Sequence, residues 1–116
     1  MRLFNRGYEI NPYPVYDKVV FRNMEKTLAL TVRADSTLIV SNLNKVNKRL
    51  NAINNDTSET EKGKVAEAFA SAIFGNEQAE KLLQFYDNDS LAVITSCGKY
   101  FQNRLSKLIT KAQKKG

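Results

Sequence analysis

The sequence contains no histidine, no tryptophan and only one cysteine, Cys97. Histidine is the commonest general base and the commonest metal ligand in proteins, so its absence argues against both of those chemistries. One cysteine excludes an internal disulfide and a zinc site built from several thiolates. A cysteine nucleophile would normally need a histidine beside it, so we expect Cys97 to be a buried structural thiol.

Long apolar runs are also missing. No segment has the roughly 20 uncharged apolar residues of a membrane-spanning helix, and residues 1–6 lack the apolar core of a signal peptide. We therefore expect a protein of the reducing cytoplasm that does not contact a membrane. The 116 residues, of which 42% are hydrophobic, predict a single domain (1–116) with a modest core. So small a domain buries a limited share of its surface, which favours a homo-oligomer.

Positive charge is concentrated near the C-terminus. The chain has a formal net charge of +6, and no acidic residue follows Asp89, although several Lys and Arg residues do. Such a segment can attract phosphate or acidic partners, but basic residues also suit the C-terminal end of a helix and a solvated face. We favour the second interpretation because no spacing selects nucleic acid. A small basic nucleic-acid-binding protein of phage or plasmid origin is the alternative.

The N-terminal third combines an irregular segment with β-type alternation. Pro12 and Pro14 argue against helix, so residues 1–14 are expected to form an irregular arm. Residues 15–33 contain two alternating segments around a polar loop, which predicts a β-hairpin. One face of the first segment holds Val15, Val19 and Phe21, the opposite face holds Tyr16 and Val20, and in the second segment Leu28, Leu30 and Val32 share a face. An isolated hairpin is marginal in water, so we expect it to pack on helices or on another subunit.

Residues 35–116 form the helical part of the prediction. The first helix begins at Asp35 or Ser36, either of which can cap it. Ser58 and Glu61 match a capping box at the start of the second helix, and a polar break at 87–90 precedes the fourth. The predicted fold class is therefore α+β and mostly helical, with an N-terminal β-hairpin packed on about four helices.

The segment 72–83 predicts a helix, a corner and another helix. Phe74 ends an apolar helical run, and Gly75 tolerates the left-handed conformation that ends a helix. Asn76 can then cap the next helix by accepting hydrogen bonds from its free N–H groups. We expect these three residues to form a structural corner that performs no chemistry.

Two helices carry apolar stripes that could either fill the core or contact another polypeptide. The first stripe has a period of about 3.5 residues, which is typical of helix–helix packing, and its partner-binding candidates are Ile39, Leu43, Val46 and Leu50. The second lies on the last helix, where the candidates are Tyr100, Phe101, Leu105 and Leu108. The expected core stripe of that helix is Ile94, Cys97, Phe101, Leu105, Leu108 and Ala112. For any single residue, core packing is the simpler interpretation.

The carboxylates do not indicate a catalytic pair. Acid–base catalysis needs two carboxyl groups that converge in one cleft, and spacing alone does not indicate this for Asp17, Glu25, Glu59 or Glu61. We expect them on the surface. The 87–90 segment lacks the further ligands of a calcium loop, so helix capping explains it better. With no glycine-rich phosphate loop either, we expect no cofactor, no metal and no enzymatic activity.

Residues from Leu28 to the C-terminus carry a resemblance to a known family. They are Val32–Asp35, Leu38–Val40, Leu43, Phe69, Ile73–Gly75, Glu77, Ala79–Leu83, Tyr86–Asp89, Cys97, Tyr100 and Phe101, followed by a lysine-rich end. In these residues and in the order of its elements, the chain resembles the small tail assembly chaperones encoded by long-tailed phages and prophages of Gram-positive bacteria. The N-terminal arm has no counterpart in this resemblance.

The resemblance implies a non-catalytic protein of the bacterial host cytoplasm. Such chaperones bind the tape-measure protein during tail assembly, keep its helical apolar segments soluble, help to recruit tail-tube subunits and leave before the virion matures. Many also have a longer form made by ribosomal frameshifting, with which the lysine-rich end is compatible. Helices with regular apolar stripes can exchange self-contacts for contacts with a partner's helix. A small immunity or antitoxin-type protein is a third alternative.

Overall fold

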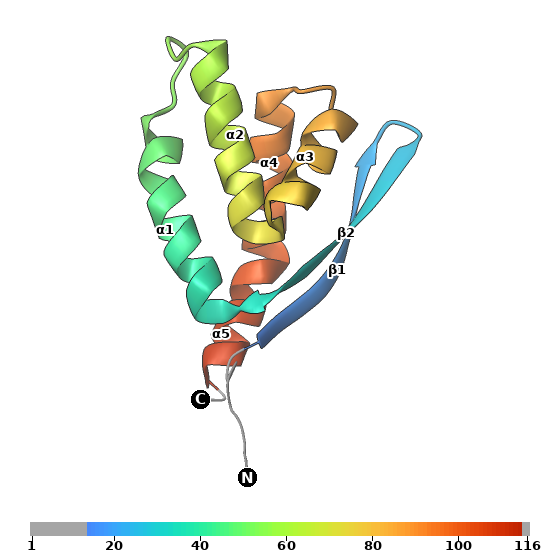
Figure 1. Cartoon of the computed structure of the whole chain (residues 1–116), viewed down its shortest axis with the longest axis vertical. Helices are drawn as coiled ribbons and strands as arrows, with labels where there is room; N and C mark the ends of the chain where they lie inside the picture. The colour runs from blue at the N-terminus through green and yellow to red at the C-terminus, as the bar shows by residue number, and fades with distance from the viewer. Residues whose placement is uncertain (1–13, 115–116) are drawn as a thin grey trace.

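The computed structural model describes residues 14–114. A two-stranded antiparallel sheet is followed by helices, so the fold is α+β and mostly helical, as predicted (Figure 1). The expected irregular arm lies outside the described residues except for Pro14, which begins the first strand. Residues 115–116 also lie outside this range.

The hairpin consists of β1 (Pro14–Asn23) and β2 (Lys26–Asp35). The strands pair from Pro14 with Asp35 to Asn23 with Lys26, so they are longer than predicted and the turn is only two residues, Met24 and Glu25. The favoured two-residue turns require a positive φ at the first central position, and Met24 has a φ of 58°.

One face of the hairpin is buried and the other is exposed, which confirms the predicted alternation. The inner face comprises Val15, Asp17, Val19 and Phe21 of β1 and Leu28, Leu30 and Val32 of β2, with Leu28 only half-buried. On the outer face, Tyr16 and Val20 are 58% and 59% exposed. The exception to the predicted pattern is Asp17, a carboxylate in the buried face.

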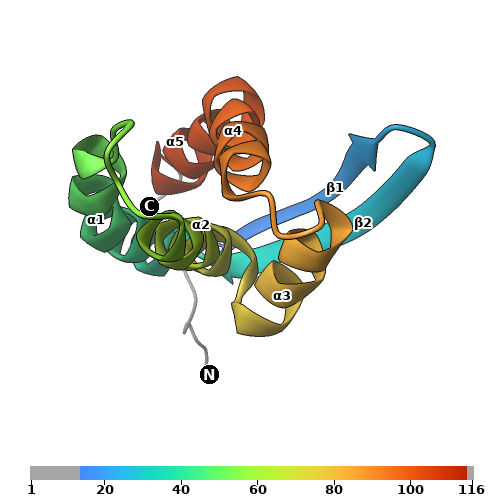
Figure 2. The same ribbon diagram turned by 90° about the horizontal axis from the view of Figure 1, so that it is seen from above.

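The helical part begins with α1 (Ser36–Ala52), α2 (Glu59–Phe74) and α3 (Asn76–Phe85). A continuous rod follows, made of α4 (Ser90–Tyr100), the π-helical turn η1 (Phe101–Leu105) and α5 (Ser106–Lys114). Seen from above, α1, α2 and α3 lie in one row, and α4 and α5 of the rod lie together along one side of this row (Figure 2). Helix α2 is central and contacts α1, α3, α4 and β2.

Three helix starts follow local capping chemistry. Asp35 accepts a hydrogen bond from the N–H of Thr37 at 2.7 Å and caps α1. Ser58 accepts from the N–H of Glu61 at 3.1 Å and caps α2, and the side chain of Asp89 caps α4. These caps confirm the predicted helix starts because each requires only a side-chain oxygen two or three residues before a free N–H.

The corner between α2 and α3 is a single residue, Gly75. Its N–H donates to the carbonyl of Ser71 and completes α2, while its carbonyl accepts from the N–H of Ala79 and begins α3; both bonds are 2.9 Å. Its φ of 84° and ψ of 161° lie in a region essentially restricted to glycine. The predicted cap at Asn76 is wrong, because so short a corner makes Gly75 the capping position and Asn76 already helical.

Gln78 joins α3 to the outer edge of β2. Its Oε1 accepts from the N–H of Thr31 at 2.8 Å, and its Nε2 donates to the carbonyls of Thr31 at 2.7 Å and Phe74 at 2.9 Å. The side-chain amide therefore supplies the pairing that a neighbouring strand would have given Thr31, and it places the start of α3 against the hairpin.

Aromatic packing connects the hairpin, α2 and α4. The ring of Phe74 lies edge-on to Phe21, with 5.7 Å between centroids, and stacks with Tyr100 at 5.9 Å. All three side chains are more than nine-tenths buried. The residue that ends α2 therefore also anchors the inner face of the hairpin to the rod.

The π turn displaces the buried stripe of the rod. The buried positions are Val93, Cys97, Tyr100, Leu105, Ile109 and Ala112. The steps along this stripe are three or four residues, as in an α-helix, except for a step of five at η1. The predicted stripe is therefore wrong at three positions: Ile94, Phe101 and Leu108 are only half-buried at its edge.

An ion pair between the buried carboxylate of Asp17 and the more exposed guanidinium of Arg104 joins β1 to the rod. The carboxylate of Asp17, only 6% exposed, accepts from Nε of Arg104 at 2.7 Å and from its terminal nitrogen at 2.8 Å. It also accepts from the hydroxyl of Tyr100 at 2.8 Å. The predicted surface position of Asp17 is wrong because two residues more than eighty positions away supply its partners.

The cluster shifts the pKa of each of its members. Hydrogen bonds from the Arg104 side chain lower the pKa of Asp17 below its ordinary value, despite the opposing effect of burial. Burial, with the adjacent Asp17 carboxylate, raises the pKa of Tyr100, and the bond to Asp17 raises that of Arg104. At neutral pH the cluster therefore consists of a carboxylate, a guanidinium and a neutral phenol.

Glycine substitutions test the corner. We expect Gly75→Ala to lower the free energy of unfolding by about 1–3 kcal/mol, because alanine resists this backbone conformation. Gly98→Ala is the matched control: an added Cβ meets no atom within 4 Å at either position, but Gly98 lies inside α4. It should stabilise the protein by up to ~1 kcal/mol. Urea unfolding measures both changes, and equal effects would contradict the assigned strain.

Removing one partner tests the ion pair of Asp17 and Arg104. We expect Arg104→Met to destabilise the protein at pH 7, because the buried Asp17 carboxylate would lose its main partner. The pKa of Asp17 is lowered in the folded protein, so this stabilisation is complete above the ordinary carboxyl pKa of 3.8 and is lost as pH falls through the folded value.

Urea unfolding at pH 7 and pH 3 therefore should show the deficit of Arg104→Met shrinking in acid. Arg49→Met is the control, because Arg49 pairs with Glu61 at 3.3 Å with both side chains more than two-fifths exposed. Its effect should not exceed about 1 kcal/mol. A deficit for Arg104→Met that is as small as the control's at pH 7 would be evidence against the ion pair.

Candidate functional site

A groove runs along the outer side of the row formed by α1, α2 and α3. It consists of three adjoining hollows with volumes of about 700, 360 and 350 Å³, which share lining residues with one another. Its floor is α2, which contributes the small residues Ala68, Ser71 and Ala72, followed by Gly75, while Lys64 and Glu67 of α2 line the upper hollow of about 700 Å³. Because α2 presents so little volume here, the larger side chains of α1 and α3 rise above it as walls.

The lower end of the groove is the more apolar. Its hollow of about 360 Å³ is lined by Leu38, Ile39, Ala72, Ile73 and Phe74, with polar groups at its margin. Leu38 is 55% exposed at the margin of this hollow. This end can accommodate large apolar side chains of a partner.

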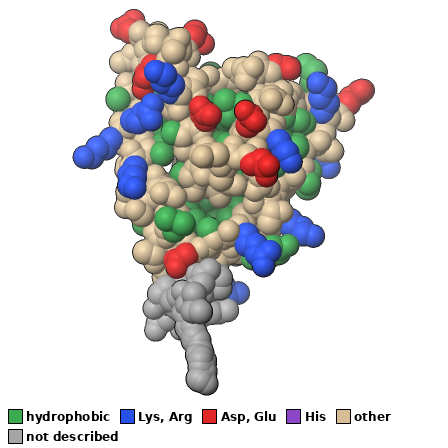
Figure 3. Space-filling model, viewed as in Figure 1, with side chains coloured by type: hydrophobic (Ala, Val, Ile, Leu, Met, Phe, Trp, Pro, Cys, Tyr) green, Lys and Arg blue, Asp and Glu red, His purple; other side chains and the backbone are tan. Residues whose placement is uncertain are grey.

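The two walls carry opposite charges. Lys45 and Arg49 of α1 line one side of the groove, while Glu77 and Glu80 of α3 line the other. Figure 3 shows this face, with Lys and Arg side chains along α1, acidic side chains toward α2 and α3, and hydrophobic side chains between them. The pairing of Arg49 with Glu61 at the upper end is exposed and therefore weak, so a partner's carboxylate can compete for Arg49.

The groove has the length of a short helix. The lining residues of α1 extend from Leu38 to Arg49, which at the rise of an α-helix corresponds to roughly 16 Å, or three turns. An open hollow of this length with an apolar end and charged rims suits a helical segment better than a compact small molecule, which needs an enclosing pocket.

The first predicted stripe lies along the side of α1 that faces the core. Ile39 and Val46 are buried, at 1% and 7% exposure, and also line the groove. Leu43 and Leu50 are half-buried against the same core. The stripe therefore packs within the chain, and two of its members contribute to the groove from below.

The second predicted stripe lies away from the groove. Tyr100 and Leu105 are buried in the core, and Phe101 and Leu108 are half-buried at its edge. The predicted corner does reach the groove: Phe74 and Gly75 line its lower hollow, and Asn76 lines the other two. The structure thus brings part of the first stripe together with the corner and leaves the second stripe apart.

Sequence reasoning missed the residues that define the groove. They are Asn42, Lys45 and Arg49 of α1, Ala68 and Ser71 of α2, and Glu77 and Glu80 of α3. The available signal was the run of small residues in α2, of which Ala68 and Ser71 are half-buried and Ala72 is buried. Small side chains along a helix indicate a groove only when the neighbouring helices are placed.

Residues 14–114 hold no exposed thiol, no cluster of three metal-ligating side chains and no helix that could span a membrane. Cys97 is buried, as predicted, and burial raises the pKa of its thiol to about 12. In this part of the chain no three acidic or thiol side chains gather as a metal site would require. None of the helices in the same range is long and apolar enough to span a membrane.

Comparisons of this chain with protein-family models, with curated proteins and with solved structures find no match.

Proposed function

We propose that the protein is a non-catalytic tail assembly chaperone of a long-tailed phage or prophage, which binds helical segments of a tape-measure protein and helps to recruit tail-tube subunits. The observation that carries the proposal is the groove over α2, about three helical turns long, with an apolar lower end and charged walls. The resemblance of 28–116 to these chaperones supports it independently of the groove.

The small floor of the groove suits helix binding. A partner helix can approach the backbone of α2 closely where Ala68, Ser71 and Ala72 face it, and its large apolar residues can enter the lower hollow beside Leu38. Each leucine buried there would contribute roughly 1.5–3 kcal/mol. One or two such anchors offset only part of the cost of association, which is about 4–15 kcal/mol. Binding through one groove is therefore reversible, as a chaperone that leaves the assembled tail requires.

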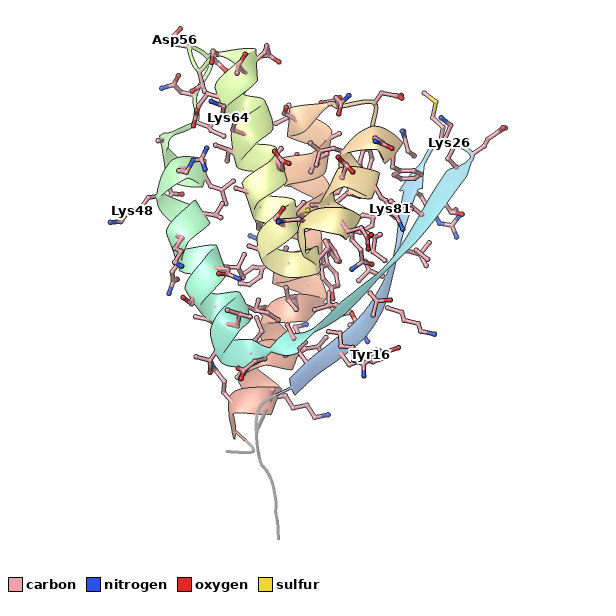
Figure 4. The ribbon with its side chains drawn as sticks, in the orientation of Figure 1. Tyr16, Lys26, Lys48, Asp56, Lys64 and Lys81 are labelled. Atoms are coloured by element: carbon pink, nitrogen blue, oxygen red, sulfur yellow. The ribbon has the colours of Figure 1, made fainter. Side chains whose placement is uncertain are left out.

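A second candidate function rests on the outer face of the hairpin. Tyr16 projects from this face (Figure 4), and Lys18, Arg22 and Arg33 are exposed there, while no acidic side chain points outward from residues 16–22 or 27–33. A basic sheet face with an exposed aromatic ring can bind single-stranded nucleic acid. We favour the chaperone because the groove is a concave surface that can enclose part of a partner helix, whereas the argument for the hairpin face rests on exposed side chains alone.

Co-expression with a tape-measure fragment tests the proposed function. The fragment is a long apolar helical segment of the tape-measure protein of a long-tailed phage of Gram-positive bacteria, and we expect the chain to keep it soluble and to co-purify with it. Leu38→Glu should weaken binding about ten-fold or more, because it removes an apolar contact in the lower hollow.

Leu91→Glu provides the control, since Leu91 is 71% exposed and also lies in the first turn of a helix, α4. It should leave binding unchanged. Failure of the chain to bind the fragment, combined with DNA binding that weakens steeply with salt, would support the second candidate function instead.

A further inference from the structure

We propose that the opposite charges of the two walls determine the direction in which a bound helix lies. The occupant is a helix of a partner polypeptide, about three turns long, with apolar residues toward α2, acidic residues along the flank next to α1 and basic residues along the flank next to α3. This inference rests on the proposed function and specifies the chemistry of the client.

The basic wall is uniform in charge. Helix α1 contains no acidic residue, and Lys45 and Arg49 line the groove from it. Lys64 of α2 also lines the upper hollow and lies on the side of α2 that faces α1, whereas Lys48 points away from the groove (Figure 4). Apart from Arg33 of β2, which lines the lower hollow, the cations that line the groove are therefore on the α1 side.

The acidic wall is on the other side of the floor. Glu77 and Glu80 line the upper hollow from the first turns of α3, and Glu67 joins them from α2. All three side chains are exposed. A client is therefore attracted to both walls only if its two flanks carry opposite charges. A client with the same charge on both flanks is attracted to one wall and repelled by the other.

The handedness of the α-helix converts this asymmetry into a direction. In Figure 1, α1 lies to the left of α2 and runs upward from the hairpin, and α3 lies to the right. The space-filling view in the same orientation (Figure 3) shows the face that carries the groove, so the groove opens toward the viewer. Successive residues of an α-helix turn by about 100°. In a right-handed helix that runs parallel to α1 with residue i against α2, residue i+1 lies toward α1 and residue i−1 toward α3.

The order of charges around each apolar anchor therefore selects the direction. A client with the order Lys–Leu–Glu places its acids toward α1 when it runs parallel to α1. A client with the order Glu–Leu–Lys makes the same contacts only when it runs antiparallel, since reversing a helix in a groove exchanges its flanks. Two clients of identical composition are thus expected to bind in opposite directions.

Two designed peptides test the inference. Each has 18 residues with the same composition and apolar spacing, one with Lys–Leu–Glu triplets and the other with Glu–Leu–Lys triplets, and each carries a nitroxide at its N-terminus. Paramagnetic broadening of the amide signals of the ¹⁵N-labelled protein locates that end. We expect the first peptide to broaden the amides around Leu38 and Asn42, and the second to broaden those around Arg49 and Lys64.

Exchanging the wall charges should reverse both results. The variant Lys45→Glu/Arg49→Glu/Glu77→Lys/Glu80→Lys changes only exposed side chains, and circular dichroism checks its fold. The control is Lys48→Glu/Lys81→Glu, which leaves the groove lining unchanged and should keep the original directions. In 0.5 M salt the preference should fall several-fold, because screening weakens exposed charge pairs.

The outcomes separate this inference from the function on which it rests. If both peptides bind but broaden the same end, or both ends equally, the direction rule is wrong and the helix-binding function stands. If neither peptide nor the tape-measure fragment binds, the proposed function fails. A dimer that protects the groove amides without any peptide would overturn the inference, because the occupant would then be a second copy of this chain.

Discussion

The conformation of Gly75 is the constraint on which the other features of this molecule depend. With one residue between α2 and α3, the direction of α3 is determined by a single pair of backbone dihedrals. That direction places Gln78 against the open edge of β2 and holds Phe74 between the hairpin and the rod. It also positions Glu77 and Glu80 as one wall of the groove. Core packing and the proposed site therefore depend on the same corner.

The groove and the core divide the apolar residues of the chain between them. The buried stripe of α1 is largely used in the interior, so a client does not need to open the fold to find an apolar surface. In the proposed function, a client helix would instead contact the small residues of α2 and the exposed Leu38. A rigid floor with charged rims gives modest affinity but a defined orientation, and a protein that must release its client can use that combination.

Local interactions were predictable from the sequence, whereas features that depend on distant residues were not. Asp35, Ser58 and Asp89 cap their helices through groups two or three residues away, and hairpin alternation follows from burying one face of a strand. The burial of Asp17 depends on Arg104, which lies 87 positions later. The loss of the cap at Asn76 depends on a corner of one residue, and the groove requires three helices to be placed before its walls exist. The π turn at Phe101–Leu105 interrupts the regular apolar pattern from which the buried stripe of the rod was predicted.

The π turn also determines how the rod would respond to changes in its length. The buried residues on its two sides are joined by the five-residue step from Tyr100 to Leu105. Losing one amino acid between them would leave a four-residue step, so an ordinary α-helix could present every buried side chain inward. Losing one amino acid elsewhere in the rod would instead rotate part of the stripe into water. The segment is thus the one place along the described rod where a codon could be deleted while its inward face was preserved.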